Sequence, residues 1–204
     1  MQGTDCCGFV CPSPGTDESF VGRRVLVRSC MRVDGFSSGE TRWLGSDMDG
    51  AFAQFVVVPA NEVFPVDCDW TDAELATIPC AYGTAENMIA RAGVRRGSTV
   101  LITGASGGVG SAAVQLAVRR GARVIGVASR AKHEQLRELG VDEVYGRDAD
   151  LVDALGTRSS MWWSTTSQPT VSVLCSTSSF VGERTYPRVR SRDPSSRWIY
   201  GRCT

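Results

Sequence analysis

The chain has 204 residues, of which 42% are hydrophobic and 22% charged, with 22 basic and 22 acidic side chains. This composition is typical of a globular protein, and the length allows one domain or slightly more. Zero net charge argues against a nucleic-acid-binding surface, and no apolar run approaches the ~18 residues of a membrane span. The eight cysteines form no C-x-x-C pair, and no secretory signal precedes them. We therefore expect a cytoplasmic protein with reduced thiols that binds neither nucleic acid nor a membrane.

The first part of the chain carries short strand and helix signals. Residues 24–27 and 53–58 are rich in Val and Phe and predict two strands. A capping box at 71–74 predicts a short helix that ends before Pro79, because proline interrupts a helix interior. A second helix is expected over 84–92, where a glycine follows it.

From Ser98 the pattern changes to strand, glycine turn, helix, strand, helix, strand. The strand segments are apolar without polar alternation, which is typical of strands buried on both faces of a parallel sheet. Strands are expected at 100–102 and 124–128, a third strand is expected to start with 143–145, and helices are expected at 110–120 and 131–139. This order predicts an α/β fold with right-handed crossovers, in which a Rossmann-type parallel sheet carries helices on both faces.

The glycine turn after the first of these strands predicts a dinucleotide site. The turn leaves a predicted strand and opens a predicted helix, as a G-x-G-x-x-G motif requires. The second glycine of that motif lets backbone approach a pyrophosphate, and the third lets helix and strand pack closely. Phosphates would bind at the helix start, so the candidate residues are Ala105, Ser106, Gly107, Gly108, Val109 and Gly110. A glycine-rich loop without a ligand is the alternative.

The end of the second strand bears on the choice of cofactor. An NAD site usually places Asp or Glu there, but this chain has Ala128, followed by Ser129, Arg130 and Lys132. A carboxylate would repel a 2′-phosphate, whereas Arg and Lys attract it. We therefore expect NADP(H), with Ser129, Arg130 and Lys132 near the 2′-phosphate. Solvated residues at a helix start are the alternative.

Four segments together resemble the medium-chain dehydrogenase/reductase superfamily, at 3–8, 49–55, 78–85 and 97–110. The glycine loop that begins with Ala is most similar to the zinc-independent, quinone-oxidoreductase-like branch. The likeness runs over residues 2–157. It implies a partial GroES-like β-barrel catalytic domain at 1–70 and an incomplete dinucleotide-binding domain at 71–157.

The resemblance implies hydride transfer between NADP(H) and a small carbonyl, enone or quinone acceptor, with Thr84 near the nicotinamide. It identifies no catalytic side chain. Zinc-dependent members have Gly-His-Glu where this chain has Gly3-Thr4-Asp5, and Thr is a poor zinc ligand. We therefore expect no metal and interpret Cys80, at another ligand position of such members, as a packing residue. A zinc-dependent, alcohol dehydrogenase-like member is the alternative.

Residues 158–204 match nothing in the superfamily and carry a net charge of +5, with 11 Ser and no Ala. Back-translated one base out of frame, they permit apolar strings in the order of the family's next strands. We therefore expect a frameshift near 156–160, and an N-terminus that enters the catalytic domain partway. The homodimer of complete members is then not expected of this chain. The alternative is a non-catalytic dinucleotide-binding fragment whose basic tail contacts a partner.

Overall fold

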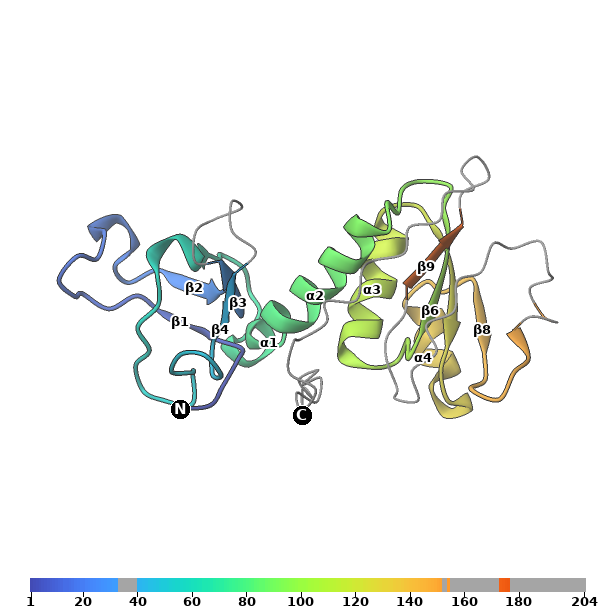
Figure 1. Ribbon diagram of the computed structural model, residues 1–204, viewed down its shortest axis with the longest axis horizontal. Coiled ribbons are helices and arrows are strands. Elements are labelled where there is room, and N and C mark those ends of the chain that lie inside the picture. The colour runs from blue at the N-terminus through green and yellow to red at the C-terminus, as the bar shows by residue number, and fades with distance from the viewer. Residues whose placement is uncertain (33–39, 152–153, 155–172, 177–204) are drawn as a thin grey trace.

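The computed structural model describes residues 1–32, 40–151, 154 and 173–176. Short antiparallel strands from the N-terminal part gather on one side, and a larger sheet with its helices gathers on the other (Figure 1). The helix α2 (Ile78–Arg91) runs between the two groups (Figure 1). In these ranges, no helix is both long enough and apolar enough to cross a membrane.

The N-terminal strands form two small antiparallel sheets. One sheet has the order β1-β2-β5, and the other pairs β3 with β4. The strands are β1 (Cys7–Phe9), β2 (Arg24–Val27), β3 (Cys30–Arg32), β4 (Thr41–Trp43) and β5 (Val63–Pro65), and short 3-10 turns lie at η1 (Glu18–Phe20) and η2 (Ala60–Glu62). The strand predicted at 24–27 is confirmed. These described strands do not close into a barrel, because β1 and β5 are both sheet edges.

The strand predicted at 53–58 is wrong, since this segment is irregular in the structure. Its Val and Phe residues suggested a half-buried strand, yet Phe55 and Val57 are 74% and 90% exposed. No described strand pairs with the segment, and β propensity alone does not form a strand without a partner.

The capping box at the start of α1 (Asp72–Ala76) is confirmed. The hydroxyl of Thr71 accepts from the N–H of Glu74, and the Glu74 carboxylate accepts from the N–H of Thr71 at 2.8 Å. The next helix, α2, begins at Ile78, six residues before the predicted start. Pro79 lies in its first turn, where a missing N–H breaks no helical hydrogen bond, and α1 ends before this proline, as predicted.

The larger sheet has the order β8-β7-β6-β9. Its strands are β6 (Thr99–Thr103), β7 (Arg123–Val127), β8 (Glu143–Tyr145) and β9 (Val173–Ser176), with the helices α3 (Gly108–Arg119), η3 (Arg130–Lys132) and α4 (His133–Glu138). The pairs β6–β7 and β7–β8 are parallel, as predicted. The strand β9 is a departure, because it pairs antiparallel with β6.

The main core lies on one face of this sheet. Val100, Ile102 and Val124 are fully buried there, together with residues of α2, α3 and α4. Leu101, Ile125 and Val127 point to the opposite face, where Tyr145 and Leu151 pack against them. The described helices therefore cover one face, and the prediction of helices on both faces is shown only in part. In a doubly wound sheet, the second helical layer follows the third strand, and here the described residues after β8 are 146–151, 154 and 173–176, with Leu151 and Ala154 helical.

The tail predicted to be out of frame, 158–204, likewise lies outside the described residues except for β9.

Candidate functional site

The segment between β6 and α3 turns sharply at its first glycine. Gly104 has a φ of +63°, a left-handed conformation that glycine adopts without strain. The N–H of Gly107 donates to the carbonyl of Gly104 at 3.0 Å, and the N–H of Ala105 donates to that of Val127 at 3.1 Å. Because Val127 belongs to β7, the second bond joins the loop to the neighbouring strand. The sheet therefore fixes the position at which α3 begins.

Two glycines of the loop have different structural requirements. A Cβ atom at Gly110 would lie 2.1 Å from the oxygen of Gly104 and 2.9 Å from the Cα of Ala105. Only glycine lets α3 pack so closely on the loop, as expected for the third position of the motif. A Cβ atom at Gly107 would meet the oxygen of Gly104 at 3.4 Å, an ordinary contact. Packing does not require a glycine at 107, whereas the close approach of a pyrophosphate would.

The start of α3 offers N–H groups to a ligand. Its N-cap, Gly107, has no side chain that could accept from them. In the part of the chain that the structure describes, the N–H groups of Gly108 and Val109 have no hydrogen-bond partner, whereas Ser111 donates to Gly107 at 2.7 Å. Unpaired donors and the helix dipole both attract a negative group. The loop from Ala105 to Gly110 therefore fits the pyrophosphate of a dinucleotide.

The predicted 2′-phosphate residues follow β7. Ser129 precedes the 3-10 turn η3 and is partly buried, while Arg130 and Lys132 lie in that turn and are exposed. The Arg130 guanidinium lies 3.8 Å from the Asp148 carboxylate, and both side chains are more than three-quarters exposed. An exposed pair of this kind is weak, so it leaves Arg130 able to bind another anion.

The helix α2 reaches the glycine loop. The Cβ of Ala81 lies 4.0 Å from the position that a Cβ would take at Gly108. Thr84 follows three residues later, on the same side of the helix as Ala81, and is partly buried. Among the described residues, no hydrogen bond joins Thr84 to the loop, so its place beside a nicotinamide stays a prediction.

Three residues at this site were missed by sequence reasoning. The glycine at 104 follows a strand directly, and that position was a signal for the left-handed turn that it makes. Ala81 gave no signal, since it contacts the loop from a different helix. Asp5 gave none either: its carboxylate accepts from the N–H of Cys80 at 2.7 Å, across 75 positions of the sequence.

No protein-family model matches the chain. It is similar over 112 residues to erythronolide synthase EryA2 of Saccharopolyspora erythraea, at 46% identity over 54% of this chain and 3% of that protein. It is 40% identical to the acryloyl-coenzyme A reductase of Metallosphaera sedula, over 41% of this chain and 25% of that one. The mitochondrial NAD(P)H oxidoreductase RTN4IP1 of Mus musculus is 36% identical, over 61% and 34%.

Two solved structures share this fold. An alcohol dehydrogenase superfamily protein from Novosphingobium aromaticivorans aligns with a TM-score of 0.63 at 30% identity, over 76% of this chain and 43% of that one. The quinone oxidoreductase from Coxiella burnetii aligns with a TM-score of 0.63 at 26% identity, over 76% and 45%. The chain belongs to the medium-chain dehydrogenase/reductase superfamily. It spans about a third or less of these curated relatives and less than half of these solved structures.

Asp5 and Cys80 of this superfamily member lie together at the start of α2. Burial raises the pKa of the Asp5 carboxyl, and the hydrogen bonds from Cys80 and Ser29 lower it in part. Over the described ranges, no three His, Cys, Asp or Glu side chains are grouped as they would be around a metal ion. His133, the single histidine, starts α4 and lies 3.4 Å from the carbonyl oxygen of Ala128 through its Nε2.

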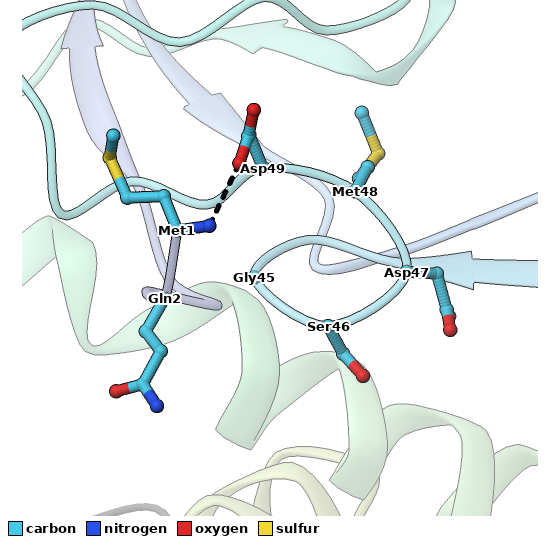
Figure 2. A pocket seen from close by; sticks show the side chains of 7 residues that line it. All are labelled: Met1, Gln2, Gly45, Ser46, Asp47, Met48 and Asp49. Carbon is cyan, nitrogen blue, oxygen red and sulfur yellow. Dashed lines mark hydrogen bonds and ion pairs between the residues drawn. The ribbon is translucent and has the colours of Figure 1, made fainter.

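A depression of about 420 Å³ lies on the N-terminal side of this medium-chain dehydrogenase/reductase, away from the glycine loop. Figure 2 shows its lining, in which the N-terminal ammonium contacts the Asp49 carboxylate at 2.8 Å. Asp47 accepts there from the N–H of Trp43 at 2.8 Å. Two carboxylates would repel a pyrophosphate, so this depression does not suit the cofactor.

Proposed function

We propose that the chain carries the cofactor site of an NADP(H)-dependent oxidoreductase, which transfers a hydride between nicotinamide and a small carbonyl, enone or quinone acceptor. The observation that carries this proposal is the loop before α3. Close packing requires the glycine at 110 but not the glycine at 107, and the N–H groups at the start of α3 are unpaired in the described part of the chain. The similarity to an acryloyl-coenzyme A reductase and to a quinone oxidoreductase supports an electron-poor acceptor.

In the proposed reaction, the bound nicotinamide supplies the hydride. The N–H groups of Gly108 and Val109 bind the pyrophosphate, and Ser129, Arg130 and Lys132 bind the 2′-phosphate. Thr84 orients the nicotinamide end beside the acceptor. The chain holds the two reactants together and excludes water, which is its main contribution to a hydride transfer. The acceptor gains the hydride and one proton, and we assign no side chain of the chain as the donor of that proton.

We further propose that the N-terminal strands belong to a GroES-like substrate domain at 1–70, and that the reaction needs no zinc. The second point rests on Thr4, which stands where related zinc enzymes have a histidine, and on the Asp5 carboxylate, which already accepts from a backbone N–H. Metal analysis of the purified chain tests it, since stoichiometric zinc would favour the alcohol dehydrogenase-like alternative.

Arg130→Ala tests the cofactor assignment. A charged hydrogen bond is worth about 1.5–3 kcal/mol, so NADPH affinity should fall by roughly 10- to 100-fold, while NADH affinity changes little. Titration of each dinucleotide by calorimetry measures both. Arg137→Ala is the matched control, because this arginine lies in α4, is 57% exposed and pairs with Glu134. Equal losses for NADPH and NADH in Arg130→Ala would refute the assignment.

Turnover separates the enzyme from its main rival. NADPH oxidation with a panel of quinones and enones supports the oxidoreductase. Binding of NADPH without oxidation of it would favour a non-catalytic dinucleotide-binding fragment.

A further inference from the structure

The first turn of α2 is not capped by the side chain of its own N-cap residue. Thr77, its N-cap, has helical dihedral angles and makes no capping bond, because its hydroxyl donates to the carbonyl of Glu74 at 2.7 Å. Thr77 also ends α1, so the two helices share this residue. Pro79, in the first turn, has no N–H. The donor at Cys80 is therefore left for a partner from elsewhere.

That partner is Asp5, from the N-terminal segment before β1. Its Oδ1 accepts from the N–H of Cys80 at 2.7 Å and from the hydroxyl of Ser29 at 3.4 Å. The short distance to Cys80 is typical of a bond to an ionised acceptor, and a negative charge at a helix N-terminus is favourable. Burial nonetheless raises the pKa of Asp5, so the ionised side chain is held where water would solvate it better.

Cys80 is next in sequence to Ala81, the residue of α2 that contacts the glycine loop. Ala81, the next residue, contacts the position of Gly108 at 4.0 Å. Thr84 lies one helical turn after Cys80, on the same face. Further along, Ala85 and Ile89 are fully buried in the core that includes α3. A shift of the first turn of α2 is therefore passed on to the start of α3 and to Thr84.

We propose that Asp5 is a positioning residue of the cofactor site: by capping α2 from the N-terminal segment, it holds Ala81 against Gly108 and sets the direction of Thr84. This inference rests on the proposed NADP(H) site. In the described part of the chain, the hydrogen bonds of Asp5 go to Cys80 and Ser29, and Asp5 acts through the backbone of Cys80. The N-terminal segment before β1 thereby contributes to the cofactor site through the start of α2.

Amide hydrogen exchange tests the inference without any turnover. The two probes are the N–H of Cys80 and the N–H of Ser111, which forms the first bond of α3 to Gly107. In Asp5→Ala, both amides should exchange at least fivefold faster than in the wild-type chain. Asp5→Asn keeps an acceptor oxygen and should restore most of the protection. Asp17→Ala is the matched control, since Asp17 caps η1 through a 2.9 Å bond to Ser19 and is exposed.

Binding of NADPH provides the second measurement. Asp5→Ala should weaken NADPH about tenfold, the size expected when a helix cap is lost, whereas Asp17→Ala should not change it. In a Thr84→Ala background, the effect of Asp5→Ala on kcat should fall to less than twofold, because the two residues act through one helix. If Asp5 were only a structural cap, Asp5→Ala would lower the folded fraction of the chain. Its effect on kcat would then be the same in the wild-type and the Thr84→Ala backgrounds.

Each outcome decides the inference. Faster exchange at Cys80 with unchanged exchange at Ser111 would overturn it, since the cap would then end at α2. If Asp5→Ala does not fold, Asp5→Asn and Ser29→Ala are measured instead. The inference then requires that the amide exchange rates of Cys80 and Ser111 change in proportion. If the wild-type chain binds no NADPH, the proposed function fails, while the exchange result still decides whether Asp5 positions α3.

Discussion

Replacing Gly110 by Ala should destabilise the chain because the new methyl group meets backbone. Its Cβ would lie 2.1 Å from the oxygen of Gly104 and 2.8 Å from the carbonyl carbon of the same residue. Neither atom can turn away as a side chain would. The start of α3 must therefore move roughly 1 Å from the end of β6, against a core in which Ala112 and Ala113 are fully buried.

The expected loss of unfolding free energy is about 2 kcal/mol. Overpacking of a well-filled core costs about 1–3 kcal/mol, and a backbone obstacle lies at the upper end of that range. Alanine recovers about 0.5–1 kcal/mol relative to glycine through its higher helix propensity. For a urea m value of about 2 kcal/mol/M, the midpoint should fall by about 1 M, as followed by circular dichroism.

Two other glycines make the control. Gly83→Ala in α2 meets nothing within 4 Å, so the same change should stabilise the chain by about 0.5–1 kcal/mol. Gly107→Ala makes one ordinary contact, so it should lose less than about 1 kcal/mol of stability but should greatly weaken NADPH binding. A Gly110→Ala variant with the midpoint of the wild-type chain would refute the close packing of α3 on the loop.

Two further predictions concern the N-terminal half. Thr71→Ala removes the capping box of α1 and should lower the unfolding free energy by about 1 kcal/mol in urea; an unchanged midpoint would mean that the box adds no stability. Because the folded-state pKa of Asp5 is raised above 3.8, the folded chain binds this proton more tightly than the unfolded chain, and the stability contributed by Asp5 falls as pH rises through that window. Asp5→Asn should therefore gain stability relative to the wild-type chain as pH rises from about 3 to 6, and a loss over this range would contradict the burial argument.

The parallel strands and the glycine loop were predictable because their signals are local. Continuous apolar runs predicted β6 and β7 to within one residue at each end, and β8 starts where the sequence predicted a third strand to start. The loop was predictable because its spacing reflects a close approach of backbone, which the contact between Gly110 and Gly104 confirms. Which cofactor the loop binds stays a proposal. Arg130 is exposed, and among the described residues its ion pair is with Asp148.

The predictions that were wrong concern residues whose structure depends on partners distant in the sequence. The second helix was predicted to start at 84, but α2 starts at Ile78 with Pro79 in its first turn, because proline is favourable in a first turn and unfavourable in an interior. The strand predicted at 53–58 has the right composition and no partner to pair with. The antiparallel direction of β9 had no local signal, since strand direction is set by the connection between strands.

By itself, then, the sequence determined the elements whose signals lie among neighbouring residues, namely the parallel strands, the capping box of α1 and the glycine loop before α3. Only the tertiary structure decided how α2 is capped and what that cap supports. Asp5 and Cys80 are 75 positions apart, and the hydrogen bond between them exists because folding brings the N-terminal segment to the start of α2. A periodic pattern indicates which face of an element is buried, but it does not indicate which distant residue will cap the end of a helix.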